Sequence, residues 1–131
     1  MAVTLKVRAG KPLKAAFNYW QPGMRGQDGG LVDTTGYTAR IQVRATQRPG
    51  RILLNSKEWV APNTDTPVPA GTILRRVEPG SWRLVLSGAV TRSLPQSSRF
   101  EVELVNDLDP DDSVPLADGV ILVQPEVVSG G

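Results

Sequence analysis

The fold is decided by residues 37–44, which read YTARIQVR. Every second side chain is apolar or aromatic, namely Tyr37, Ala39, Ile41 and Val43. The side chains between them are polar, namely Thr38, Arg40, Gln42 and Arg44. Alternation with a period of two is typical of a β-strand that buries one face and exposes the other. We therefore predict a strand here, which begins after a turn over Asp33–Gly36.

The same alternation recurs on both sides of this strand. Five further segments show it clearly: Val3–Arg8, Leu13–Tyr19, Trp82–Leu86, Arg99–Val105 and Gly119–Gln124. Weaker strands are predicted at Arg51–Asn55, after a Pro49-Gly50 turn, and at Ile73–Val77, on the edge of a sheet. These strands supply the predicted core, in which Trp82 lies on an inward-facing row.

Helical spacing is almost absent from the chain. Only Gly88–Leu94 fits a single helical turn, which Pro95 would end because proline disfavours helix in the residue before it. About seven short strands and at most one short helical turn predict an all-β fold. The expected architecture is an antiparallel β-sandwich, with a small barrel as the alternative.

Three segments are predicted to lie between strands. Gln21–Gly30 holds four glycines and a proline, so we expect a loop with little to pack and much backbone freedom. Trp59–Thr72 contains three prolines and is expected to be an extended connection. Asn106–Ser113 is expected to be a polar loop before the last strand.

Length and composition limit the possible functions. With 131 residues the chain has the size of one domain, with its core within residues 3–127 and a flexible tail at 127–131. It has no Cys and no His, which excludes thiol and imidazole catalysis, disulfides and zinc fingers. No apolar run approaches the roughly 18 residues of a membrane span. We expect a protein made and kept in the cytoplasm that is no enzyme and binds no cofactor.

The net charge of +2 hides a strong division along the chain. All 15 Lys and Arg residues lie before residue 100, where there are five acids. Residues 100–131 carry eight acids and no base. This asymmetry predicts electrostatic pairing within the fold or between subunits, and makes a uniformly basic nucleic-acid surface a poor expectation.

Eight residues are candidates for a partner interface. They are Trp20, Met24, Arg25, Arg40, Arg44, Trp59, Glu101 and Glu103. The charged side chains share outward strand faces, where they would pair across strands or meet a partner. Trp20 and Trp59 border the loops at Gln21–Gly30 and Trp59–Gly71, where a tryptophan could either anchor a partner or cover the end of the sandwich.

A calcium site is a weaker alternative. Asp107, Asp109 and Asp111 alternate as carboxylate ligands do in a calcium loop. The sixth position, however, is Asp112 where the turn of such a loop needs glycine. A solvated hairpin loop is therefore the preferred interpretation, and no metal is expected.

A longer pattern carries a resemblance to a known family. Residues 33–44, DTTGYTARIQVR, resemble the DLTGYTARMQVR stretch of small tailed-phage proteins, including the N-terminal domain of phage baseplate upper proteins. Three later features follow in the expected order: Pro79–Ser87, Thr91–Pro95 with Phe100–Leu104, and Gly119–Val127. The chain departs from the pattern at Thr34, where leucine is usual, and is longer at Gln21–Gly30 and Trp59–Gly71.

The resemblance implies an immunoglobulin-like β-sandwich that serves as a part of the virion. Such a protein would dock onto other tail, baseplate or neck proteins, would form a homo-oligomer within the particle and would have no catalytic role. The two longer loops would be its docking elements. A head decoration or cement protein, or a carbohydrate- or receptor-binding module, are the alternatives.

Overall fold

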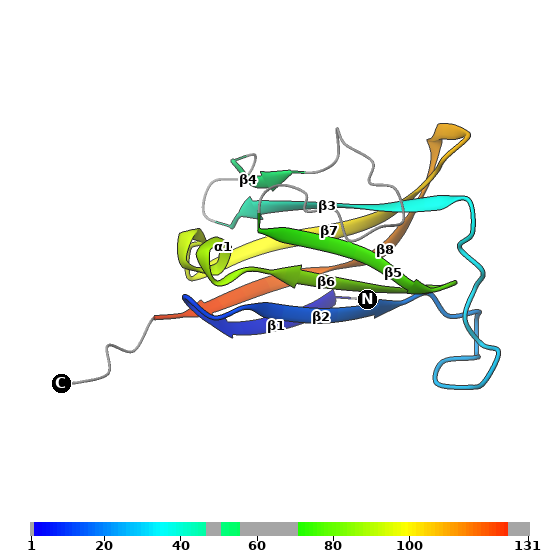
Figure 1. Cartoon of the computed structure of the whole chain (residues 1–131), viewed down its shortest axis with the longest axis horizontal. Coiled ribbons are helices and arrows are strands. Elements are labelled where there is room, and N and C mark those ends of the chain that lie inside the picture. Colours follow the sequence, from blue (N-terminus) through cyan, green and yellow to red (C-terminus); the bar gives the residue numbers. More distant parts are fainter. Residues whose placement is uncertain (1, 47–50, 56–70, 126–131) are drawn as a thin grey trace.

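The structure, a computed structural model, describes residues 2–46, 51–55 and 71–125. Within them the chain forms two sheets packed face to face and one short helix (Figure 1). The first sheet has five strands in the order β1-β8-β7-β3-β4, and the second has three in the order β2-β6-β5. The two sheets share no strand, so the all-β sandwich is confirmed and the small barrel is not formed by the described residues.

The elements have the following bounds. The strands are β1 Ala2–Arg8, β2 Leu13–Asn18, β3 Tyr37–Ala45, β4 Ile52–Asn55, β5 Thr72–Glu78, β6 Ser81–Leu86, β7 Ser97–Asn106 and β8 Asp109–Gln124, and the helix is α1 Gly88–Ser93. The predicted strands all exist, including the β3–β4 hairpin and the edge strand β5. The predicted turn at Pro49-Gly50 and most of the predicted connection Trp59–Thr72 lie outside the described residues.

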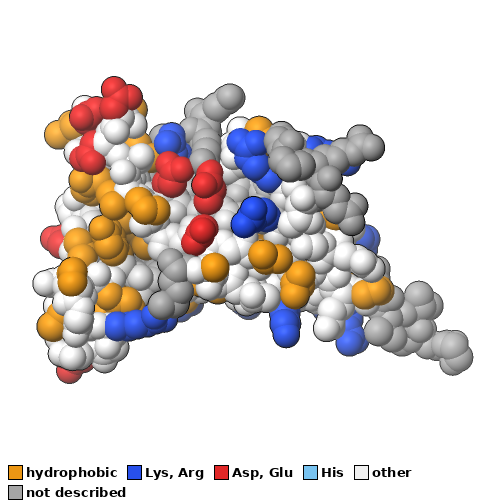
Figure 2. All heavy atoms as spheres, turned by 180° about the vertical axis from the view of Figure 1, so that it is seen from behind, with side chains coloured by type: hydrophobic (Ala, Val, Ile, Leu, Met, Phe, Trp, Pro, Cys, Tyr) orange, Lys and Arg blue, Asp and Glu red, His pale blue; other side chains and the backbone are white. Residues whose placement is uncertain are grey.

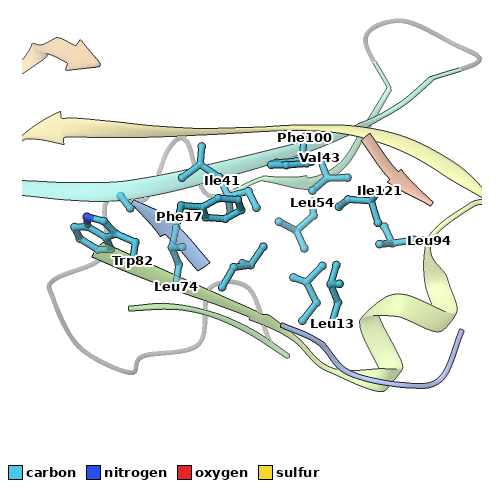
Figure 3. Close-up of a cluster of buried hydrophobic side chains, with 14 of the residues drawn as sticks. Leu13, Phe17, Ile41, Val43, Leu54, Leu74, Trp82, Leu94, Phe100 and Ile121 are labelled. Atoms are coloured by element: carbon cyan, nitrogen blue, oxygen red, sulfur yellow. The ribbon is translucent and has the colours of Figure 1, made fainter. Parts of the chain in front are cut away.

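The core lies between the inner faces of the two sheets (Figure 3). Ile41 and Val43 of β3 and Val102 of β7 are fully buried, as their alternation predicts. Trp82 of β6 is also fully buried, which confirms its predicted place in the core. Phe17 of the second sheet meets the first sheet with its ring centroid 5.9 Å from that of Phe100. Burying each of these side chains stabilises the fold by about 1.5–3 kcal/mol.

The single helical turn is confirmed as α1. Its first N–H groups have no partner within the helix, and the Ser87 hydroxyl accepts a hydrogen bond from the Val90 N–H at 3.3 Å. Leu94 ends the helix in an extended conformation, as expected for a residue before proline. The helix closes one end of the sandwich (Figure 1).

Two features of β8 differ from the predictions. The predicted loop Asn106–Ser113 is wrong, because β8 begins at Asp109 and pairs with β7 along its whole length. Only Asp107 and Leu108 separate the two strands. In addition, β1 pairs with β8 in parallel, so the sandwich is not antiparallel throughout.

The loop at 21–30 is also more regular than predicted. Three successive turns close through hydrogen bonds from Met24 N to Gln21 O, from Gln27 N to Met24 O, and from Gly30 N to Gln27 O. Each turn has a glycine at positive φ, namely Gly23, Gly26 and Gly29. Gln21 N also donates to Gly30 O at 2.7 Å, which closes the base of the loop. The expected lack of internal order is therefore wrong.

Candidate interaction surfaces

The outer face of the five-stranded sheet brings four of the predicted interface residues together. Arg40 and Arg44 lie on β3, and Glu101 and Glu103 lie on the neighbouring strand β7. Arg40 is directly opposite Glu103, and its guanidinium donates to the Glu103 carboxylate at 3.0 Å. Both side chains remain about one-fifth exposed, so the predicted cross-strand pairing is confirmed at a partly buried position.

Further along β3 the polar side chains form a chain of hydrogen bonds. The Arg44 Nε–H donates to Gln42 Oε1 at 2.7 Å, and Gln42 Nε2 donates to Asn55 Oδ1 of β4 at 3.2 Å. Gln42 is only 4% exposed, although the alternation places it on the outer face. Its buried amide is satisfied by these bonds, which fix the side chains of β3 and β4 relative to one another.

Like charges also lie side by side on this face. Arg44 is opposite Arg99 on β7, and Glu101 is opposite Asp118 on β8. Figure 2 shows the resulting separate groups of acidic and basic side chains. Like charges directly opposite each other oppose strand pairing, so this arrangement does not by itself stabilise the sheet.

The predicted interface residues of the turn loop form a second group. Trp20 makes an isolated bridge to Leu31, which joins the two ends of the loop. Trp20 and Arg25 line a cavity of about 190 Å³ together with Phe17 and Leu116. Met24 is half-buried. The remaining candidate, Trp59, lies outside the described residues.

The tip of the β7–β8 hairpin is a third surface, for which the sequence predicts only a solvated loop or a calcium site. It projects beyond the sandwich at the end that also carries the turn loop (Figure 1). Leu108 stands at the apex and is 94% exposed. The Asn106 side chain accepts a hydrogen bond from the Leu108 N–H at 2.9 Å, which fixes the turn. The backbone that carries the exposed Leu108 side chain is thus held by a hydrogen bond.

Hydrogen bonds from β3 brace this tip. The Tyr37 hydroxyl donates to Asp112 Oδ2 at 2.9 Å, and the Thr38 hydroxyl donates to Asp107 Oδ1. The Asn106 amide, followed by the Tyr37 hydroxyl, lowers the pKa of Asp112 below its ordinary value. The same bond to Asp112 raises the pKa of Tyr37, because it favours the protonated phenol.

Three carboxylates of the tip each accept hydrogen bonds from different partners. Asp107 contacts Thr38, Asp112 contacts Tyr37 and Asn106, and Asp109 accepts from the Asp111 N–H at 3.1 Å. Among the described residues no three acidic groups converge as the ligands of one metal ion would.

A cleft lies at the opposite end of the molecule, beside α1. It has a volume of about 530 Å³ and lies between the end of β3, the start of β4 and the segment after the helix. Leu53, Leu94 and Pro95 supply its apolar lining, and Arg51 supplies a positive charge. No signal of period or motif in the sequence marks this cleft, because its walls come from separate segments.

Comparison with known proteins adds no assignment. No protein-family model matches this chain, and no curated protein matches it either. The described part of the chain contains no helix that is long and apolar enough to cross a membrane.

Proposed function

We propose that this chain is a non-enzymatic structural protein of a bacteriophage particle, a tail, baseplate or neck component that docks onto other virion proteins. It is made in the host cytoplasm and ends up in the virion. The observation that carries the docking role is the braced hairpin tip with Leu108 94% exposed. A turn whose backbone is fixed before contact loses less conformational entropy on binding than a flexible one, which favours recognition.

The phage assignment rests on the resemblance of residues 33–44. The turn Asp33–Gly36 leads directly into β3, and β3 lies between β7 and β4 in the larger sheet. Thr34, the position that departs from the pattern, is buried, and its hydroxyl accepts a hydrogen bond from the Gly80 N–H at 2.9 Å. The departure thus comes with a compensating contact between the loops of the two sheets.

A carbohydrate-binding module has less support. Such a module needs an exposed aromatic platform, whereas Trp82 is fully buried and Trp20 is half-buried. Titration with glycans, followed by tryptophan fluorescence, is expected to leave the emission unchanged.

The proposal is tested by blocking synthesis of the chain in the phage that encodes it and examining the products by electron microscopy. We expect incomplete particles, restored by the wild-type chain supplied from a plasmid. Antibody labelling should fall on the tail, the baseplate or the neck. Labelling on tailless capsids would favour a head decoration protein, and complete infectious particles without the chain would contradict the proposal.

A further inference from the structure

The charged side chains are separated between the two ends of the sandwich. Seven acids lie at the end that carries the hairpin tip: Asp28, Asp33, Glu78, Asp107, Asp109, Asp111 and Asp112. Three contacts tie these segments together, because Gly36 O accepts from Asp107 N, Tyr37 contacts Asp112, and Thr34 contacts Gly80. Arg25 and Arg76 are basic residues near the same end, so its charge is predominantly but not wholly negative.

The other end is basic. Six exposed basic residues lie there: Arg8, Lys11, Lys14, Arg51, Arg92 and Arg99. Arg8 pairs with Gln124 at the end of β8, Lys11 O accepts from the Thr91 hydroxyl of α1, and Arg99 lies at the start of β7. No acid of the described residues lies on the turns and strand ends that form this end.

These two ends are far apart. β8 runs from one to the other over 16 residues, which corresponds to roughly 50 Å at about 3.3 Å per residue. This exceeds the screening length of about 8 Å at physiological salt, so the two ends do not neutralise each other within one molecule. The charge division of the sequence therefore becomes a division along the long axis.

Each end also carries an apolar feature that could contact the other end of a second copy. The acidic end presents Leu108 on a braced turn, and the basic end presents the cleft lined by Leu53, Leu94 and Pro95 with Arg51 beside them. An apolar knob flanked by carboxylates is thus matched by a cleft with an apolar wall, polar side chains around it and the guanidinium of Arg51 beside it. Complementary charge steers the encounter, and burial of the leucine supplies affinity.

We propose that copies of this chain associate head to tail, with the Leu108 tip of one copy seated in the Arg51–Leu94 cleft of the next. The knob and the cleft lie on different surfaces of the molecule, so the contact is heterologous and each copy can bind two others. Such contacts close into a ring or continue as a filament. This contact would link copies of the chain within the particle. Only its place in a phage particle rests on the proposed function.

The test uses the purified chain alone, in sedimentation velocity over a concentration series at low and high salt. We expect oligomers at low salt that dissociate as salt rises from about 0.05 to 0.5 M, where screening shortens severalfold. Leu108→Ser should weaken association about tenfold or more. The matched control Val77→Ser, which changes another exposed apolar residue at the same end, should leave it unchanged.

A charge exchange tests the geometry of the contact. Arg51→Glu and Asp111→Arg should each weaken association when alone, whereas an equimolar mixture of the two variants should associate again. In the mixture the unchanged acidic tip of the Arg51→Glu variant meets the unchanged basic cleft of the Asp111→Arg variant, so the two variants pair. Circular dichroism and unfolding curves must show that each variant is folded.

Two results would overturn the inference. One is a chain that stays monomeric up to millimolar concentration at low salt, and the other is an oligomer that Leu108→Ser and both charge variants leave unchanged. Neither result bears on whether the chain belongs to a virion, because that is decided separately by its presence in particles.

Discussion

Gly119 of β8 lies so close to the backbone of Val3 of β1 that a Cβ at this position would overlap the nitrogen and the carbonyl oxygen of Val3. The two residues are direct partners in the parallel pairing of the strands. The absence of a side chain is what lets β1 join the sheet here.

Gly119→Ala should therefore lower the free energy of unfolding by at least about 2 kcal/mol, because β1 must move away from β8. Urea denaturation measures the change. Ser113→Ala, at an exposed position of the same strand, is the control and should change the stability by less than about 0.5 kcal/mol. Equal stability of the two variants would show that β1 does not pack against β8 at this position.

The bond between Tyr37 and Asp112 predicts a dependence of stability on pH. The pKa of Asp112 is lower in the fold than its ordinary value of 3.8, so its stabilising contribution is present above that value and is lost as the pH falls toward the folded pKa. Tyr37→Phe should be less stable than the wild type at pH 7, and the difference should shrink below pH 3.8. The urea midpoint measured across this range gives the difference, and Tyr19→Phe serves as the control without a bond to Asp112.

The raised pKa of Tyr37 predicts the opposite behaviour in alkali. Its contribution is present below the ordinary value of 10.0 and is lost as the pH rises through the higher folded pKa. Spectrophotometric titration of the Tyr19→Phe variant, in which Tyr37 is the remaining phenol, should show ionisation above the ordinary value of 10.0, and adding Asp112→Asn should remove this delay. A Tyr37 whose titration Asp112→Asn leaves unchanged would contradict the bond.

The Arg40–Glu103 pair should contribute modestly to stability. A double-mutant cycle with Arg40→Met and Glu103→Gln should give a coupling free energy of about 1 kcal/mol, because the pair is partly shielded from water. The coupling should fall as salt is added. A coupling near zero at low salt would mean that the two side chains do not act together in solution.

Thr34→Val should reveal how the two sheets are joined at the turn. The substitution keeps the shape of the side chain but removes the buried acceptor of the Gly80 N–H, so we expect a loss of about 1–3 kcal/mol. Thr35→Val at the neighbouring exposed position is the control for the loss of a β-branched hydroxyl, and its bond with Asp33 is solvent-exposed. A larger loss at Thr35 than at Thr34 would contradict this role.

The sequence predicts those strands that bury one face and leave the other polar. The alternation at residues 37–44 and at Phe100, Val102 and Leu104 identifies the inner faces of β3 and β7 correctly, because period two is a property of any strand between core and solvent. The first half of β8 does not show this alternation clearly. It pairs with β7 but lies in the projecting hairpin, where both faces are polar over residues 109–113 and two prolines, Pro110 and Pro115, suggest a loop.

Long-range contacts account for most of what the sequence does not reveal. The parallel pairing of β1 with β8 joins the two ends of the chain, and no local pattern specifies it. Gly23, Gly26 and Gly29 are spaced three residues apart, which is a signal for successive turns. The high glycine content of the segment suggests a flexible loop instead, so this signal is easily missed. The sequence does not show that Leu108 and the Arg51–Leu94 cleft lie at opposite ends of the molecule, because this placement depends on the whole fold.

Quantitative mass spectrometry of purified phage particles tests most directly whether the chain is a structural part of the particle. We expect a fixed number of copies per particle, greater than one. The chain present in the infected lysate but absent from purified particles would contradict it.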